Sequence, residues 1–234
     1  YNYKYKMIKK GIILAGGTGT RLSPLTKSVN KQLLPIHDKP MIFYPLSVLM
    51  LANIRDILMI VNPGQIENFR SLLGDGSRYG IKIKYKIQNK PGGLPEAFIL
   101  GKSFIDNDNV ALILGDNFFY GQSLAKKLEK SSKHKSGAKI FLKDVVFPKN
   151  YGVAKLEKNK IKKIVEKPKK FISNKAITGL YFFDKNVSYY ANKLKPSKRG
   201  ELEITDLIKN YHKKNKLNFE LIGRGAIWSD AGKI

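Results

Sequence analysis

The chain has 234 residues, 42% of them hydrophobic, and a formal net charge of +26. With 12 Tyr and 12 Phe it is not a disordered chain, and it is long enough for one large domain with a substantial core. It contains no cysteine, which excludes disulfides and a catalytic thiol. No apolar run reaches the ~20 residues of a membrane span, and the start lacks an apolar leader, so a cytoplasmic protein is expected.

The positive charge is compatible with a nucleic-acid-binding module. However, only six of the 44 basic residues are arginine, on which specific base readout most depends, and the lysines are spread along the whole chain. This pattern favours a solvated lysine surface without a specific nucleic-acid partner, which binds polyanions non-specifically at low salt.

The first half of the chain predicts alternating strands and helices, which is typical of a mostly parallel α/β sheet. Residues 1–7 are polar and are expected to be a lead that precedes a single domain at 8–234. Apolar runs predict buried strands at 10–14, 57–61 and 110–114, and alternation with lysines predicts a half-exposed strand at 81–87. Helices are expected at 41–51, 65–73 and 96–103.

The second half is less regular but continues to predict both kinds of element. Strands are expected at 138–145, 178–183, 219–222 and 226–228, and a hairpin is expected from 151–156 and 162–166. Helices are expected at 187–194 and 204–212. No repeat or linker marks a second domain.

The first strand ends in a glycine-rich loop, which runs from Ala15 to Arg21. Its glycines permit close approach of the backbone, its backbone N–H groups can bind an anion, and Arg21 suits phosphate. Neither the third glycine of the Rossmann pattern nor the Gly-Lys-Ser/Thr of the P-loop is present. The loop alone therefore leaves two readings open, a tight structural turn and a phosphate site at the carboxyl edge of a sheet.

The segments that follow make the pattern more specific. Residues 16–22, Pro24 and residues 31–35 (Lys-Gln-Leu-Leu-Pro) resemble the signature of the sugar-1-phosphate nucleotidyltransferases. Residues 38–47, 72–76, 114–117 and 200–206 are similar to its glucose-1-phosphate thymidylyltransferase branch, and the resemblance runs from about residue 8 to residue 230. It implies an α/β fold of the nucleotide-diphospho-sugar transferase type, a Rossmann-like three-layer sandwich with a mixed, mostly parallel central sheet.

The resemblance also implies a reaction. A thymidylyl group would pass from dTTP to glucose 1-phosphate with the help of Mg²⁺, giving dTDP-glucose and pyrophosphate for dTDP-rhamnose, other deoxysugars and surface polysaccharide. In-line attack of the sugar phosphate on the α-phosphorus needs no side-chain nucleophile, so the protein aligns the substrates and neutralises their charge. Because family members form tetramers, a homo-oligomer is expected.

The family's functional residues carry over to matching positions of this chain. Arg21 and Lys31 would be catalytic, by neutralising phosphate charge, and Asp116 and Asp230 would hold Mg²⁺. The implied nucleotide-binding residues are Gly16, Gly17, Thr18, Gly19, Thr20, Gln88, Gly93 and Leu94. The implied sugar-phosphate-binding residues are Tyr151, Gly152, Glu166, Lys167, Ile177 and Thr178. The Gln88 amide matches the imide edge of thymine or uracil, and no residue separates the two.

The chain departs from the family pattern at two places. Where the family commonly has Asp-Gly-Leu-Ala-Gln, this chain has Gly92-Gly93-Leu94-Pro95-Glu96, which adds a negative charge near the nucleotide. The chain stops four residues after Asp230, whereas family members continue, so the C-terminal helices are expected to be missing. The alternatives are therefore a transferase for another nucleotide or sugar phosphate, a non-catalytic nucleotide-binding remnant and, third, a nucleic-acid-binding module.

Overall fold

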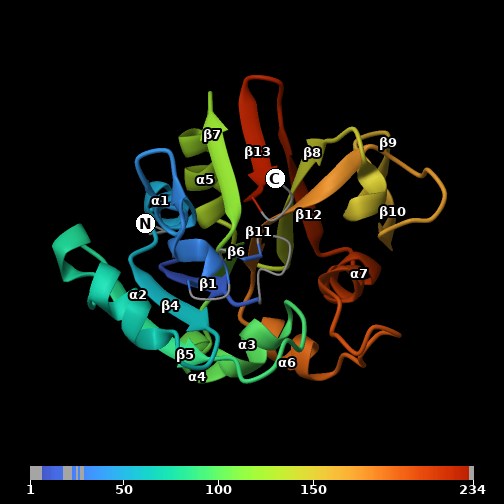
Figure 1. The fold of residues 1–234 in the computed structure, drawn as a ribbon. Coiled ribbons are helices and arrows are strands. Elements are labelled where there is room, and N and C mark those ends of the chain that lie inside the picture. The colour runs from blue at the N-terminus through green and yellow to red at the C-terminus, as the bar shows by residue number, and fades with distance from the viewer. Residues whose placement is uncertain (1–6, 18–22, 25, 27–28, 232–234) are drawn as a thin grey trace, which may run out of the picture.

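The computed structural model describes residues 7–17, 23–24, 26 and 29–231. Its centre is a nine-stranded sheet, which Figure 1 shows from one side. The strands of this sheet are β1 (Lys10–Ala15), β4 (Asp56–Val61), β5 (Lys82–Ile87), β6 (Val110–Leu114), β8 (Ala138–Asp144), β9 (Gly152–Glu157), β10 (Lys160–Glu166), β11 (Lys175–Phe183) and β12 (Leu217–Ile222).

The sheet is mixed, as predicted. Its main path is β10-β9-β11-β6-β1-β4-β5, while β8 pairs with β11 and with β12. In the N-terminal half, β1 is parallel to β4 and to β6, and β4 is parallel to β5. Strand β11 then runs antiparallel to β6 and to β8. The carboxyl ends of β1, β4, β5 and β6 therefore meet at one edge, where open α/β sheets bind their ligands.

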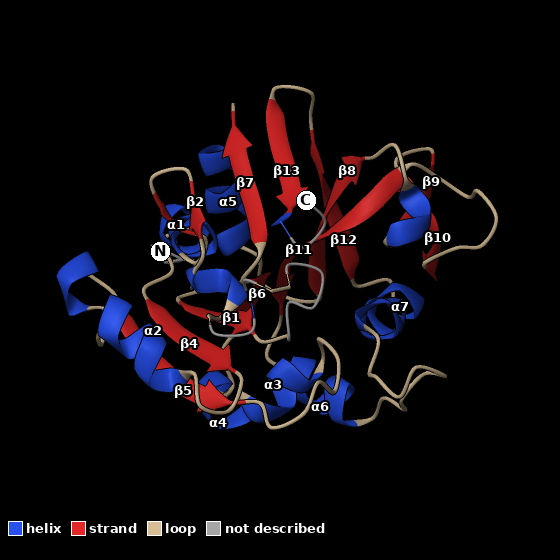
Figure 2. Cartoon of the chain, viewed as in Figure 1, coloured by secondary structure: helices blue, strands red, loops and turns tan. Residues whose placement is uncertain are grey.

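Helices cover both faces of the sheet (Figure 2). One face packs against α1 (Phe43–Leu51), α2 (Ile66–Leu73) and α5 (Leu124–Ser132), and the other against α3 (Glu96–Leu100), α4 (Lys102–Ile105), α6 (Val187–Asn192) and α7 (Ile204–Lys213). Successive strand residues alternate between these layers: Ile13 packs in the first core and Ile12 in the second. The predicted three-layer sandwich is confirmed.

Two small sheets flank the central one. Strand β2 (Pro35–Ile36) pairs with β3 (Lys39–Pro40), and β7 (Asn117–Gly121) pairs with β13 (Ala226–Asp230). In Figure 1 the red β13 lies beside the yellow-green β7, which begins just after β6. This antiparallel ribbon therefore returns the C-terminal part of the chain to the carboxyl edge of the sheet.

The strands and helices predicted from the sequence are present, with shifted ends. The helix predicted at 96–103 is two short helices that meet at Gly101, where an added Cβ would lie 3.0 Å from Ile12 Cδ1. The short strands β2 and β3, strand β7 and helix α5 were not predicted. The predicted lead lies outside the described residues except for Met7. No helix in the described part of the chain is long and apolar enough to cross a bilayer.

Candidate active site

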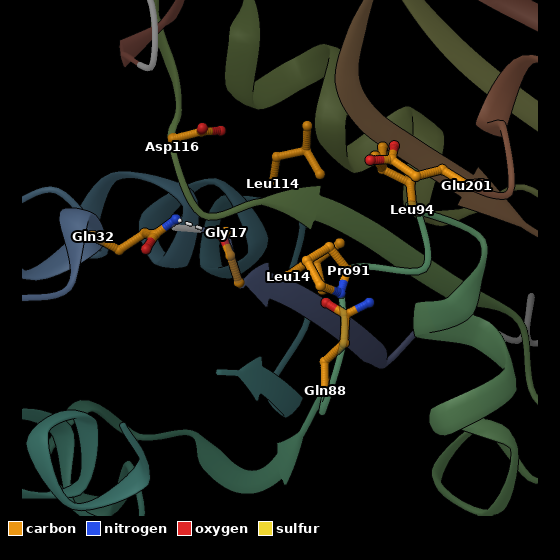
Figure 3. A pocket seen from close by; sticks show the side chains of 11 residues that line it. Leu14, Gly17, Gln32, Gln88, Pro91, Leu94, Leu114, Asp116 and Glu201 are labelled. Carbon is orange, nitrogen blue, oxygen red and sulfur yellow. Dashed lines mark hydrogen bonds between the residues drawn. The ribbon is translucent and has the colours of Figure 1, made fainter. Parts of the chain in front are cut away.

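A cavity of about 210 Å³ lies at the carboxyl edge of the parallel strands (Figure 3). It brings together residues from β1, β6 and the segments that follow β1, β5, β6 and α6. The lining residues are Leu14, Gly16, Gly17, Gln32, Gln88, Pro91, Gly93, Leu94, Leu114, Asp116 and Glu201. Five of the residues predicted to bind nucleotide and one predicted metal ligand are therefore in one place.

Side chains from neighbouring segments hold the described part of the glycine loop. Asn62, directly after β4, accepts a hydrogen bond from Gly17 N at 3.2 Å and donates one to Gly17 O at 2.9 Å. Gln32 Nε2 donates to Gly16 O at 3.3 Å. The sequence analysis missed Asn62, although an amide residue directly after the neighbouring strand was a usable signal. Thr18, Gly19, Thr20 and Arg21 lie outside the described residues.

Gln88 follows β5 and is only 6% exposed. Its backbone N–H donates to Val61 O at 2.8 Å, which extends the pairing of β4 with β5 by one residue. Its side-chain Nε2 donates to Glu96 Oε2 at the start of α3, and Gly92 N donates to the same oxygen at 3.0 Å. The negative charge that the sequence adds at Glu96 thus lies directly beside Gln88.

Gly93 joins this loop to the segment before α7. It forms an isolated parallel bridge with Leu202, and Leu202 N donates to Gly92 O at 2.9 Å. Gly93 has φ 91°, and an added Cβ would lie 2.1 Å from Leu202 O. Only glycine fits such a close approach with a positive φ. The contact brings Glu201 to the cavity.

Asp116 lies at the carboxyl edge of the sheet, where its carboxylate contacts Lys31 and Asn117. Lys31 Nζ lies 2.6 Å from Asp116 Oδ2, and the lysine side chain is only 10% exposed. Asn117 Nδ2 donates to Asp116 Oδ1 at 3.0 Å. Asp230 is opposite Asn117 in the β7–β13 ladder, and Ala231 N donates to Asp116 O at 2.9 Å. Of the two predicted metal ligands, Asp116 directly precedes β7 and Asp230 is the last residue of its partner strand β13.

The two carboxylates fit the ligand preference of Mg²⁺. The described residues contain no cluster of three or more Asp, Glu or His that could form an all-protein metal cage. Mg²⁺ is usually held by one or two carboxylates together with water and substrate phosphates, so a site built on Asp116 and Asp230 suits it.

Asn117 links this ribbon to the second half of the sheet. Its Oδ1 accepts hydrogen bonds from Gly179 N in β11 at 3.0 Å and from Trp228 Nε1 in β13 at 2.7 Å. The Trp228 ring packs edge-on against Tyr151 with centroids 5.2 Å apart. Burial and then the negative charge of Asp230 raise the pKa of the Tyr151 hydroxyl. The Asp230 carboxylate therefore acts electrostatically on a residue predicted to bind the sugar phosphate.

The residues predicted to bind the sugar phosphate converge around the β9–β10 hairpin. Glu166 is opposite Gly152, and Lys167 N donates to Tyr151 O at 3.0 Å. An added Cβ on Gly152 would lie 3.1 Å from Glu166 Oε2 and 3.7 Å from Ile177 Cδ1. Thr205 Cγ2, at 2.7 Å from the same position, fills the space that Gly152 leaves beside Glu166 and Ile177.

Two of these residues are polar and largely buried. Thr178 is fully buried, and its Oγ1 has no partner within the described part of the chain. Burial and then the neighbouring charge of Glu203 raise the pKa of Glu166. Arg199 makes short hydrogen bonds to Glu203, at 2.6 and 2.8 Å, and lies 3.7 Å from Glu166. The sequence analysis did not identify Arg199 or Glu203 as part of this network.

The arrangement has the parts that a reaction between two phosphate-bearing molecules requires. A glycine loop and an amide side chain line one cavity, a lysine and two carboxylates lie at its edge, and a second polar cluster lies beyond them. Such an edge can align two anions and neutralise their charge. Fold and site together define a nucleotidyl-transferring α/β protein.

The comparison with family models agrees with this class. The model described as "Nucleotidyl transferase" matches residues 10–234, nearly the whole chain. The chain belongs to the nucleotidyl transferase family.

Relatives and solved structures narrow the comparison. The glucose-1-phosphate thymidylyltransferase of Neisseria meningitidis is 53% identical over 224 residues, which cover 95% of this chain and 78% of the relative. That of Xanthomonas campestris is 52% identical, covering 96% of this chain and 76% of the relative. A Bacillus anthracis structure assigned as a glucose-1-phosphate thymidylyltransferase, in complex with a sucrose, has a TM-score of 0.88 and 42% identity, covering 95% of this chain and 89% of its own. A UDP-glucose pyrophosphorylase complexed with UDP-glucose has a TM-score of 0.81 and 26% identity, covering 97% and 94%.

Proposed function

We propose that this chain transfers a thymidylyl group from dTTP to glucose 1-phosphate and releases pyrophosphate. The observation that carries the proposal is the 53% identity, over 95% of the chain, to a relative with that named activity. The product, dTDP-glucose, would supply the synthesis of dTDP-rhamnose, other deoxysugars and surface polysaccharide. Because the reaction consumes a nucleoside triphosphate, we place it in the cytoplasm.

In this proposal the charged residues at the edge of the sheet act on the phosphates. Lys31, which contacts Asp116 at 2.6 Å, offsets negative charge that develops at the α-phosphorus. Arg21 has the same role by its place in the glycine-loop motif. Loss of one such charge would lower the rate on the order of a hundredfold, since about 3 kcal/mol of transition-state stabilisation is lost.

Asp116 and Asp230 would hold Mg²⁺. The cation would supply a Lewis acid that draws negative charge from the phosphate oxygens. The β7–β13 pairing and the hydrogen bond from Ala231 N to Asp116 O hold the backbones of these two residues close to each other.

The two substrates would occupy the two halves of the site. The triphosphate would lie along Gly16–Thr20, and the base would lie against Gln88, Gly93 and Leu94, because a glutamine amide matches a thymine or uracil imide. The sugar phosphate would lie in the second polar cluster, with its phosphate on Lys167 and its hydroxyls on Glu166. The remaining proposed contacts are Tyr151, Gly152, Ile177 and Thr178.

We also propose that the chain acts as a homo-oligomer without a specific nucleic-acid partner. Large apolar side chains on the β7–β13 ribbon support an association surface: Tyr120 is 69% exposed and Ile227 is 57% exposed. Analytical ultracentrifugation tests this part, and a monomer at micromolar concentration would remove it without affecting the chemistry.

A substrate panel tests the function. Purified protein with Mg²⁺ is given dTTP, UTP, CTP or ATP together with glucose 1-phosphate or galactose 1-phosphate, and pyrophosphate release is measured. The highest kcat/KM is expected for dTTP with glucose 1-phosphate. A higher value for another pair would reassign the substrate, and nucleotide binding without any release would point to a non-catalytic binding protein.

A further inference from the structure

The Gln88 amide carries two groups of opposite hydrogen-bonding character. Its NH₂ donates and its oxygen accepts. Thymine and uracil present a ring N–H between two carbonyl oxygens, whereas cytosine presents an acceptor nitrogen at the same position. For a base held at one position, the orientation of this amide therefore decides whether an acceptor or a donor faces the ring nitrogen.

Glu96 fixes that orientation from one side. Its Oε2 accepts hydrogen bonds from Gly92 N and from Gln88 Nε2. An ionised carboxylate offers acceptors only, so the NH₂ end of Gln88 is the end that faces it. The reverse orientation would place two acceptor oxygens against each other inside a site where Gln88 is 6% exposed.

The Gln88 oxygen faces the opposite way, toward the cavity. A Cβ added to Gly16 would lie 3.0 Å from Gln88 Oε1, and both residues line the cavity. In Figure 3 the amide oxygen of Gln88 lies on the side of Leu14, and the nitrogen lies on the other side. Within the described residues, the one hydrogen bond of this amide is made by Nε2. Its oxygen is thus placed to accept from a bound base.

We propose that Glu96 is a positioning residue that locks the Gln88 amide and so selects nucleotides whose base offers a ring N–H, thymine or uracil, over cytosine. The proposal rests on the proposed function, in which the nucleotide occupies this cavity. A glutamine at position 96 would not lock the amide, because it can either donate or accept. Glu96 is therefore a specificity element of this chain that acts through the Gln88 amide.

The test compares nucleotide binding to wild type and Glu96→Gln. Calorimetry with Mg²⁺ gives the dissociation constants of dTTP and dCTP. Wild type is expected to bind dTTP more tightly than dCTP. In Glu96→Gln the ratio of the dCTP to the dTTP dissociation constant is expected to fall about tenfold, since a correctly oriented hydrogen-bonding group is lost. The matched control is Glu129→Gln on exposed helix α5, where Glu129 pairs with Lys133, and it should leave the ratio unchanged.

A second background separates positioning from general damage. In Gln88→Ala, which has no amide to orient, adding Glu96→Gln should not change the ratio further. Glu96→Ala, which removes the acceptor, narrows the ratio as well and serves if Glu96→Gln does not fold. A folded Glu96→Gln with the wild-type ratio, or an equal change in the Gln88→Ala background, would overturn the proposal.

The two proposals fail separately. If wild type releases pyrophosphate from dTTP but the ratio is unchanged in Glu96→Gln, the role of Glu96 is wrong and the function remains. If the ratio narrows as expected but no pyrophosphate is released, the role of Glu96 is supported and the function is wrong.

Discussion

Single side chains hold in place the glycine loop that we propose binds the nucleotide. Asn62 makes two hydrogen bonds with the backbone of Gly17, one as donor and one as acceptor. A glycine loop is flexible in the absence of such contacts, because glycine loses the most conformational freedom on ordering. A residue outside the motif thus orders the backbone of the loop at Gly17.

Asn62→Ala should lower kcat/KM for dTTP about thirtyfold, because two hydrogen bonds of about 1 kcal/mol each are lost from the loop. The melting temperature should change little, since the contacts are exposed. Asn68→Ala, which removes an exposed amide of α2, is the control. Equal kcat/KM in both variants would show that Asn62 does not position the loop.

The raised pKa of Glu166 gives a prediction for stability against pH. Burial and then the charge of Glu203 disfavour its ionised form, so its contribution to stability is present below the ordinary pKa and is lost as pH rises through the raised one. Glu166→Gln does not ionise. The difference in melting temperature between Glu166→Gln and wild type should therefore be more positive at pH 7 than at pH 4. KM for glucose 1-phosphate should rise in the variant.

The control for Glu166 is Glu157→Gln, which changes an exposed carboxylate of the same hairpin. Its melting-temperature difference from wild type should be the same at both pH values. If Glu166→Gln behaves in the same way, the raised pKa is not a stability effect.

Strand β13 matters more for the site than for the core. It pairs with β7 alone in the described structure, and it is anchored by Trp228, the single tryptophan of the chain, which donates to Asn117 Oδ1 at 2.7 Å. Trp228→Phe keeps an aromatic ring, although a smaller one, and removes the N–H donor. We expect the free energy of unfolding to fall by about 1 kcal/mol. We expect kcat to fall by a factor that corresponds to more than this free energy, because Asp230 lies two residues further on.

The exposed aromatic Tyr120, on the partner strand β7, supplies the comparison for Trp228. Tyr120→Phe should leave the melting temperature and kcat close to those of wild type. If Trp228→Phe matched it in kcat, β13 would not be needed to place Asp230.

Strands β6 and β7 illustrate what the sequence could and could not predict. Apolar runs such as Val110–Leu114 predicted buried strands because burial on both faces leaves a local pattern. Strand β7 leaves none: Asn117–Gly121 is short and pairs with residues 226–230, far along the chain. Motifs predicted which residues lie together at the sheet edge. The contacts of Glu96 with Gln88 and of Asn62 with Gly17 form only when the folded chain brings those residues together, so no local pattern predicts them.

At the scale of the whole molecule, we expect the net positive charge to have no part in the proposed reaction. The chain carries a net charge of +26 with only six arginines, so its surface attracts polyanions without base readout. A labelled DNA duplex should bind at about 20 mM salt and be released by about 200 mM. Tight binding that survives 200 mM salt would support the nucleic-acid alternative.

The measurement that tests the account most directly is pyrophosphate release from dTTP, glucose 1-phosphate and Mg²⁺ by wild type and by Asp116→Ala, with Asp206→Ala on α7 as the control. We predict release by wild type and the control, and a loss of at least a hundredfold in Asp116→Ala, because about 3 kcal/mol or more of charge stabilisation is removed. Equal release by Asp116→Ala would contradict the central claim that the edge formed by Lys31, Asp116 and Asp230 is the catalytic centre.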